Sequence, residues 1–595
     1  MEWATFQIQG SNNENRDIIL SSLRNKIKRH FCSKAHALAE KIENLKKNDV
    51  LGKNVEAMNM SVIKETYSVF RTAYYLAKNN RPFTDHEALV ELQQLNGLKM
   101  GQILHSRFSA TNIIEHIAKE MQCSIVNNIV SSSSKLAVLL DEASTLSRKA
   151  TMIVNIKASV LGEPPEFIFL DLVELQDQTS EGIIQDLMSC LTKAGFTEEW
   201  LKQNWVSFVS DGANVMVGKH YGVSTKLKIR FPKLLTWHCM NHRLELAVSD
   251  AVDKVTALNH FKIFVEKLHI VYSKSNKNQR ELLESATEVG TQVLKIGRIL
   301  DVRWVASSFR TARAVWTSFS AVFRHFEKAS NDEQRNCTER QTYRGLGDRL
   351  KSPEFLCDIG LMYDTLHELS IVSEELQGQN MTLLRADLLV KRAIRVLTSF
   401  KTQPGAKLSD ALEAKDRGTF QDVHLKSNPK IKSINTEEFL QSLIESLQKR
   451  LPFEEEILKD LSILDTNRWP SEPGIRYGEA EIHRLCARFN LCPDQAIRGM
   501  RDIVESPQTE SQDLKPRKNC MQTFPVSTAE CERGFSIMNS IVTKKRSVLL
   551  VSNVSNLMTI NLNGPPISLF NPENYVKTWA RRHRTALHSQ GNVNL

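Results

Sequence analysis

The sequence lacks the segments that would place a chain in or across a membrane. No uninterrupted apolar run is long enough to span a bilayer. The first fifteen residues lack the apolar core of a secretory signal peptide. We therefore expect no membrane partner, and a location in the cytosol or the nucleus.

Cysteine is sparse and scattered. The chain has ten cysteines among 595 residues, and most stand alone in the sequence. Such spacing is typical of free thiols in a reducing compartment and argues against a disulfide framework. The ladder of paired cysteines and histidines that a RING-type zinc domain requires is also missing.

The remaining composition is that of a globular protein with a basic excess. Hydrophobic residues make up 41% and charged residues 25%, and the formal net charge is +10. A chain of this length predicts two or three domains. The charge favours a polyanionic partner, of which nucleic acid is the commonest, although a basic soluble protein without such a partner fits equally well.

A cluster of short apolar runs predicts a mixed sheet with covering helices. Residues 14–49 and 55–130 have the apolar spacing of helices, and short continuous apolar runs replace this spacing after Lys135. Three runs in succession, a helix over 182–194 and two further runs then follow. The expected strands are 136–140, 151–157, 167–173, 205–210 and 234–237.

Most of the chain beyond Arg243 has the apolar spacing of helices. Apolar residues recur at three- and four-residue spacing over 261–400, and again from Glu437 to about Asn490. Residues 404–436 and 506–519 are rich in Pro, Gly, Lys, Asp or Ser, which predicts exposed linkers. A final apolar-rich segment runs over 524–562.

Two aspartates stand where predicted strands end. Asp141 follows an apolar run, and Asp211 follows another and precedes Gly212. Because ligands of α/β sheets gather at strand ends, these positions suit acids that bind a metal. The alternative is that each carboxylate only caps the turn after its strand.

Two further pairs have both a structural and a functional interpretation. Cys239 and His242 form a C-x-x-H pair, which is half of a zinc site or, alternatively, a buried thiol and a hydrogen-bonded imidazole at a strand-to-helix junction. Arg303 and Trp304 are suited to hold a phosphate and stack on an unpaired base, unless Trp304 is a core anchor.

The segment that opens the last apolar stretch combines charge and capping signals. Ser527 and Glu530 have the spacing of a capping box, and Glu532-Arg533 is a charged pair. The apolar residues that follow must pack onto the core or onto another subunit.

Taken in order, four motifs resemble the hAT superfamily of transposases. They are Leu140-Asp141-Glu142-Ala143-Ser144-Thr145; Ser210-Asp211-Gly212-Ala213-Asn214 with His238-Cys239-Met240-Asn241-His242; Arg303-Trp304 with Ser307; and Ser527-x-x-x-x-Glu532-Arg533-x-Phe535-Ser536. The ending over Asn561–Tyr575 looks like domesticated vertebrate members, which are single proteins rather than mobile elements.

The resemblance implies an α/β fold with an RNase H-like core, a large all-helical insertion and a helical N-terminal region. It places the catalytic acids on Asp141, Asp211 and Glu532, with Mg²⁺ or Mn²⁺ as cofactor, and the base-stacking residue on Trp304. It places the C-x-x-H motif on Cys239 and His242. The implied domains are 1–50 (zinc-finger remnant), 51–130 (helical region), 131–260 (first part of the core), 261–505 (insertion), 506–523 (linker) and 524–595 (a C-terminal dimerisation segment, with Arg533 and Phe535, that completes the core).

The N-terminus departs from the family pattern. His30 and His36 look like the histidine end of a zinc finger, but residues 1–29 contain no cysteine, so we expect no zinc in this chain. The resemblance implies a nuclear protein that dimerises and binds DNA. Two alternatives are an active metal-dependent DNA transposase and a relative of the family members that act as SUMO ligases with SUMO-pathway partners.

Overall fold

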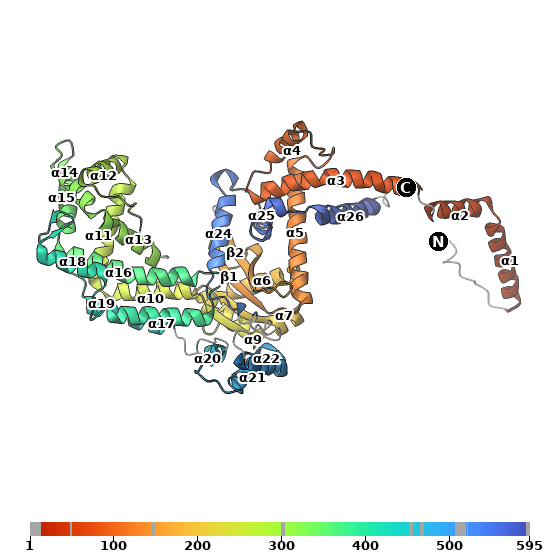
Figure 1. Cartoon of the computed structure of the whole chain (residues 1–595). Helices are drawn as coiled ribbons and strands as arrows, with labels where there is room; N and C mark the ends of the chain where they lie inside the picture. Colours follow the sequence, from red (N-terminus) through yellow and green to blue (C-terminus); the bar gives the residue numbers. More distant parts are fainter. Residues whose placement is uncertain are drawn as a thin grey trace. The chain divides into compact units, whose positions relative to one another are not determined.

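The chain divides into two compact units, which are described separately. The computed structural model (Figure 1) describes residues 13–47, 50–144, 149–298, 304–451, 456–463, 469–505, 519 and 522–590. One unit comprises Met1–His116 with Pro565–Leu595, and the other comprises Ile117–Gly564. No helix among the described residues is long and apolar enough to cross a bilayer.

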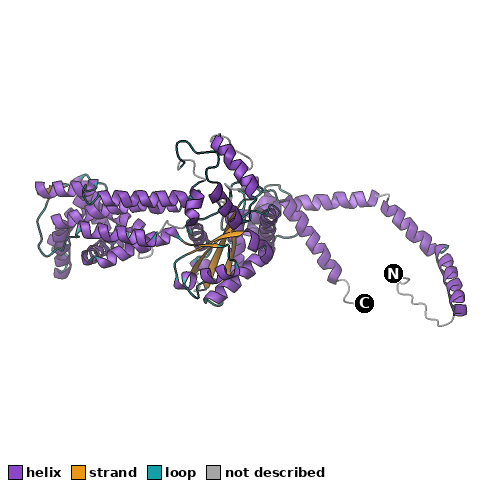
Figure 2. Cartoon of the chain, turned by 90° about the horizontal axis from the view of Figure 1, so that it is seen from below, coloured by secondary structure: helices purple, strands orange, loops and turns teal. Residues whose placement is uncertain are grey.

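The larger unit is built around a five-stranded mixed sheet, whose strands gather in one place in Figure 2. The strand order is β3-β2-β1-β4-β5. β1 pairs antiparallel with β2, and β2 with β3, whereas β1–β4 and β4–β5 are parallel. The bounds are β1 Leu136–Ser144, β2 Ala150–Ala158, β3 Glu166–Glu174, β4 Trp205–Ser210 and β5 Leu235–His238. All five predicted strands are confirmed.

One predicted strand is longer than its apolar run. The side chains of Leu136 to Leu140 are fully buried, but β1 continues to Ser144 because β2 pairs with it over its whole length. Asp141 therefore lies inside the strand, opposite Ile153, and not at the strand's end. Apolar patterning could not show this, because backbone pairing does not require apolar side chains.

Helices cover one face of the sheet. The predicted helix over 182–194 is α6 (Ser180–Ala194), capped by the Thr179 side chain and ended by Gly195 at φ 116°. Leu136, Val138 and Leu140 share a buried apolar cluster with α6 and with α9. The short helices on this side and at the sheet's end are α7 Glu198–Asn204, α8 Asn214–Val217 and α9 Val223–Arg230.

The opposite face is covered by the end of the unit. α24 (Ala529–Ile541) packs on β1 and β2, and α25 (Val551–Asn563) packs on β3. The Asn563 amide accepts from the Phe169 N–H at 3.0 Å and donates to the Phe169 carbonyl at 2.7 Å. This side chain therefore continues the backbone ladder at the edge strand. A short helix η3 (Lys544–Arg546) joins α24 to α25.

The region between β5 and α24 is helical, as predicted, but not wholly so. A small hairpin, β6 Thr419–Phe420 with β7 Val423–His424, interrupts it. Helices continue past Asn490 to Glu505. The helices are α10 Met240–Lys254, α11 Thr256–Ser273, α12 Asn276–Val289, α13 Trp304–Thr317, α14 Phe319–Asn331, α15 Cys337–Leu350, α16 Pro353–Leu376, α17 Leu383–Ser399, α18 Ala406–Arg417, α19 Thr436–Arg450, α20 Glu456–Ser462, α21 Glu479–Phe489 and α22 Pro493–Glu505.

The prediction of an exposed linker over 404–436 is wrong. Residues of this stretch form α18 and the hairpin, and α18 packs on α16. The Asp364 carboxylate, from α16, accepts from the N–H groups of Lys407 and Leu408 at 3.1 and 2.9 Å. A cap supplied by a distant helix satisfies the first turn of α18, so the local sequence carries no capping signal.

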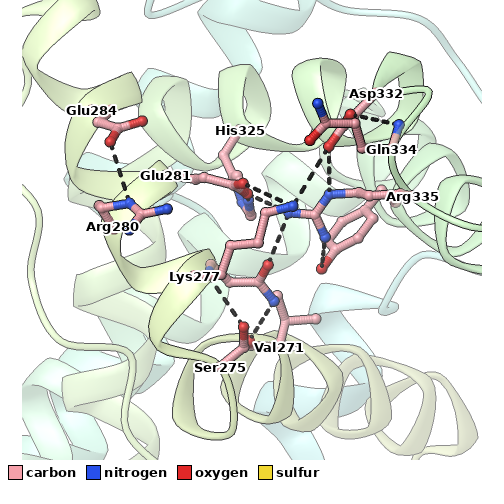
Figure 3. Close-up of polar contacts among 12 residues, drawn as sticks. Val271, Ser275, Lys277, Arg280, Glu281, Glu284, His325, Asp332, Gln334 and Arg335 are labelled. Carbon is pink, nitrogen blue, oxygen red and sulfur yellow. Dashed lines mark hydrogen bonds and ion pairs between the residues drawn. The ribbon is translucent and has the colours of Figure 1, made fainter.

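A buried polar network ties the helices of the insertion together (Figure 3). His325, which is 1% exposed, bonds to the Tyr272 hydroxyl at 3.0 Å and to Glu281 at 3.1 Å. Arg335 pairs with Glu281 and donates to the Tyr343 hydroxyl at 3.1 Å. Burial lowers the pKa of His325 to about 4, so its imidazole is neutral in this network.

The smaller unit is helical. Its N-terminal helices are α1 Asn13–Phe31, α2 Lys34–Lys47, α3 Val50–Lys78 and α4 Asp85–Leu95, and α5 (Arg107–Ser131) crosses the boundary into the larger unit. The chain returns to this unit with η4 Ile567–Leu569 and α26 Glu573–Gln590. The predicted segment 524–595 thus divides at Pro565, because its last part packs with the N-terminal helices.

Candidate functional site

The three predicted acids lie in the larger unit, on separate elements of the sheet side covered by α24. Asp141 is in β1. Asp211 comes one residue after β4, the parallel neighbour of β1. Glu532 is in the first turn of α24, which contacts β1. About 320 residues separate Glu532 from Asp211 along the chain.

The charges of these acids act on one another. The pKa of Asp141 is raised to about 7, first by burial and then by repulsion from Asp211 and from Glu532. Repulsion of this kind requires the three carboxylates to share one region of low dielectric. The three acids that the resemblance assigned to one site therefore lie near enough for the charges of Asp211 and Glu532 to act on Asp141.

Among the described residues, the hydrogen bonds to Asp141 and Asp211 come from neighbouring backbone. Asp141 Oδ1 accepts from the Glu142 N–H at 3.0 Å, and Asp211 Oδ1 accepts from the Ala213 N–H at 3.3 Å. Within the described part of the chain, neither carboxylate pairs with a lysine or arginine. Among the same residues, no group of three His, Cys, Asp or Glu side chains is arranged to hold a metal ion as it stands. As it stands, the described part of the site is a group of acids whose charges interact rather than a preassembled coordination shell.

Glu142 is a fourth acid that the sequence analysis missed. Burial and repulsion from Asp211 raise its pKa, and its Oε1 is buried without a hydrogen-bond partner. Its charge in turn contributes to the raised pKa of Asp141. The only signal in the sequence is its position next to Asp141, which by itself indicates nothing about the fold.

A histidine lies against the loop after Asp211. A Cβ on Gly212 would come within 2.3 Å of the His238 ring, so the backbone and the imidazole are in direct contact. Burial, followed by the nearby charge of Arg243, lowers the pKa of His238 to about 3. The imidazole is therefore neutral, and its buried Nε2 has no hydrogen-bond partner. His238 stands in the second motif of the resemblance, but no local pattern predicts this contact, because only the fold brings the end of β5 to this loop.

Cys239 of the C-x-x-H pair is a buried thiol at a strand-to-helix junction, as one of the two interpretations expects. Cys239, at the junction of β5 and α10, is 1% exposed, and its Sγ accepts from the Thr528 N–H at 3.3 Å. Burial raises the pKa of this thiol. The His242 ring centroid lies 5.3 Å from that of His238. This junction fastens the segment before α24 to the sheet.

A second thiol continues that attachment. Cys531, in α24, is buried and accepts from the Asn155 amide in β2 at 3.6 Å. Gly534 lies so close to Ile153 that a Cβ would meet it at 3.0 Å. Small residues on this face of α24 therefore let the helix approach the sheet closely and place Glu532 near Asp141.

The predicted capping box is wrong. Ser527 is buried and its hydroxyl donates to the Leu376 carbonyl at 2.9 Å, while the N-cap of α24 is Thr528. Glu530 instead pairs with the exposed Arg533 at 2.7 Å. Phe535 is half-buried in α24. Ser527 therefore bonds to the distant Leu376 carbonyl and does not form the capping box with Glu530 that the spacing predicted.

Trp304 begins α13 and is 5% exposed. The next residue, Val305, donates its N–H to Glu245 Oε2 at 3.0 Å, which fixes the start of the helix on α10. In this conformation Trp304 is a core anchor, and stacking on a base would require the indole to leave its site. Arg303 lies outside the described residues.

The two N-terminal histidines lie close together in the smaller unit. His30 lies in the last turn of α1 and is exposed, and its ring centroid is 5.2 Å from that of His36 in α2. The Ser33 hydroxyl accepts from the His36 N–H at 3.1 Å between the helices.

A comparison of the whole chain with models of known protein families finds no match.

Proposed function

We propose that this chain is a DNA-binding nuclear protein of hAT transposase ancestry, built on an RNase H-like core and acting as a dimer. The order of strands and helices along the chain supports this ancestry. Three antiparallel strands, two further strands parallel to the first, a long helical insertion and a return of the chain to the sheet follow the order that the resemblance implied.

One observation carries the proposal. Asp141, Asp211 and Glu532 come from three distant parts of the chain and share a site in which their charges repel. Such an arrangement opposes folding, and it is typical of a site that binds a cation or performs chemistry. A sheet that used these acids only to cap turns would have no need to bring them together.

The donor set fits the cation that the resemblance implies. Carboxylate oxygens are the ligands preferred by Mg²⁺ and Mn²⁺, and no lysine or arginine in the described part of the chain pairs with Asp141 or Asp211. When bound, such an ion supplies Lewis-acid stabilisation of charge at a phosphodiester. The residues themselves would hold the ion, with Asp141 and Asp211 from the sheet and Glu532 from α24.

Dimerisation through residues 524–565 is part of the proposal. Most apolar residues of α24 and α25 are buried within the same chain, which leaves the loop between them to make an intermolecular contact. Val548 is 92% and Leu550 is 63% exposed there. Val548→Asp is expected to shift the protein from dimer to monomer in sedimentation equilibrium. A wild-type protein that sediments as a monomer would remove this part of the proposal.

The second candidate is an active metal-dependent strand-transfer enzyme, and the assembled acids favour it. Nothing among the described residues favours the SUMO ligase alternative over these two. The two supported candidates are separated by the variant Asp141→Asn, with Asp253→Asn, an exposed position on α10, as the matched control.

The test measures Mn²⁺ binding by calorimetry, DNA binding by fluorescence anisotropy over a range of salt, and nicking of supercoiled DNA in Mn²⁺. Salt-dependent DNA binding by wild type and by both variants supports the DNA-binding function. Nicking that only Asp141→Asn abolishes would establish the enzyme. A wild-type protein that binds neither DNA nor Mn²⁺ would refute the proposal.

A further inference from the structure

A short loop, residues 218–222, joins α8 to α9 beyond the end of β4 that carries Asp211. Its tip consists of Lys219, His220 and Tyr221, and all three side chains are exposed. Gly222 closes the loop and is buried. The tip therefore presents a cation and an aromatic ring to the solvent a few residues after an acid of the candidate site.

The backbone of this loop is held in one conformation by its own contacts. The Gly222 N–H donates to the Gly218 carbonyl at 3.0 Å, and the Thr225 hydroxyl donates to the same carbonyl at 3.0 Å. A Cβ on Gly222 would come within 2.5 Å of the Gly218 nitrogen, and one on Gly218 within 2.7 Å of the Asn214 carbonyl oxygen. The loop is a tight turn that needs both glycines, and a turn ordered before binding loses little entropy when a ligand binds.

Tyr221 has the largest exposed fraction of any aromatic side chain in the part of the chain that the structure describes. The value is 80%. Its aromatic neighbour is His220, whose ring centroid lies 6.4 Å away. An exposed apolar side chain on its own needs no explanation. An exposed ring next to a cation, however, is the combination on which an unpaired base stacks while the cation holds a phosphate.

The cation beside Tyr221 has no protein anion. Lys219 forms no ion pair within the described residues. The basic residues of the helix that follows are paired, because Lys226 contacts Glu181 and Arg230 contacts Glu198. The positive charge that is free to meet a phosphate therefore lies at the tip of the loop.

The connection from Asp211 to the loop is short and helical. The N–H groups of Val217 and Gly218 donate to carbonyls one turn earlier, at 3.0 and 2.9 Å. Met216, within this turn, is buried in the apolar cluster under α6, which fixes the turn to the sheet. Residues 213–218 rise by about 8 Å along such a helix, which is the length of two or three nucleotides at about 3.4 Å each. One strand would therefore reach both Asp211 and the tip.

We propose that the tip binds an unpaired nucleotide of a DNA strand, with its base stacked on Tyr221 and a neighbouring phosphate held by Lys219. The inference rests on the proposed DNA-binding function and deepens it, because it names a single strand as the partner at this end of the sheet. Tyr221 and Lys219 position the strand. Asp141, Asp211 and Glu532 remain the candidates for chemistry.

The test measures binding of a fluorescein-labelled single strand and of a duplex with closed ends. Tyr221→Ala should weaken binding to the single strand by about 10-fold, through loss of one stacked base, and leave duplex binding unchanged. Tyr221→Phe keeps the ring and should bind as wild type does. Phe108→Ala removes another exposed aromatic ring, in the smaller unit, and should have no effect on either substrate.

The charge of the tip is tested separately. Lys219→Met should reduce the slope of log K against log salt by about 0.7, the contribution of one phosphate on a single strand. Lys219→Arg keeps the charge and should keep the slope. An unchanged slope in Lys219→Met would overturn the assignment of a phosphate to Lys219.

A spectroscopic signal distinguishes stacking from a change in folding. Single strands that carry 2-aminopurine at successive positions should lose fluorescence on binding wild type at the position that stacks, and Tyr221→Ala should abolish this quenching. Equal affinity and equal quenching in wild type and Tyr221→Ala would overturn the inference while DNA binding stands. Equal weakening on single strand and duplex would also overturn it, since a duplex with closed ends has no unpaired base. Wild type that binds neither substrate would overturn the proposed function as well.

Discussion

Gly212 and His238 are in contact across the ends of two neighbouring strands, closer than any Cβ at position 212 would allow. The contact holds the loop that carries Asp211 against a neutral imidazole. Since β4 and β5 are parallel, the residues that follow them meet at the same edge of the sheet. The position of Asp211 therefore depends on Gly212, because only a residue without a Cβ fits against the His238 ring.

Gly212→Ala tests that dependence. The added methyl group must displace His238 or the loop, which we expect to cost about 1–3 kcal/mol of unfolding free energy and to abolish Mn²⁺ binding. Gly345→Ala is the control, because a Cβ there meets nothing and the position is inside a helix. The control should be slightly stabilised. Urea unfolding and calorimetry measure both effects, and a Gly212→Ala protein with wild-type stability would show that the contact is not needed.

Asp141→Asn is expected to change how stability depends on pH. The folded-state pKa of Asp141 is about 7, above the value near 4 of an unfolded carboxyl. Between these values the folded chain holds a proton that the unfolded chain has lost, so the wild type loses stability as pH rises from 4 to 7. The variant lacks this loss and should be more stable than wild type at pH 8, by about 1–3 kcal/mol.

Thermal unfolding in EDTA at pH 5 and pH 8 checks this expectation. The gap between Asp141→Asn and wild type should open as pH rises, and Asp253→Asn should show no such gap. A gap that is the same at both pH values would show that the carboxyl of Asp141 has an ordinary pKa.

The edge of the sheet provides a third prediction. Asn563→Ala leaves the N–H and the carbonyl of Phe169 without their partners and should cost about 2 kcal/mol. Asn556→Ala, on the same helix, has no such bonds to lose and serves as the control. Hydrogen exchange of the Phe169 amide should accelerate in the first variant alone, and an unchanged rate would contradict the assigned role of Asn563.

The polar network around Glu281, His325 and Arg335 provides a fourth prediction. Arg335→Met removes the cation that contacts Glu281 beside His325 and leaves Glu281 only Lys277, at 3.7 Å, which is expected to cost about 2 kcal/mol. The double variant Arg335→Met with Glu281→Met should recover much of this loss, because it removes both charges. Urea unfolding of the two variants measures the difference. A double variant less stable than the single one would contradict the account.

The sequence by itself determined the five strands of the large sheet, most of the helices, and the placing of Asp141 and Asp211 beside predicted strands. Runs such as 136–140 are buried by the hydrophobic effect in any fold, and α6 is bounded by Thr179 and Gly195, whose roles are local. Only the tertiary structure decided that the stretch after Pro404 is folded, since its cap, Asp364, comes from another helix. It also decided that Trp304 is buried and that His238 and Glu142 belong to the acid site. Contacts between residues far apart in the chain leave no local pattern, and about 320 residues separate Asp211 from the Glu532 carboxylate that completes the site.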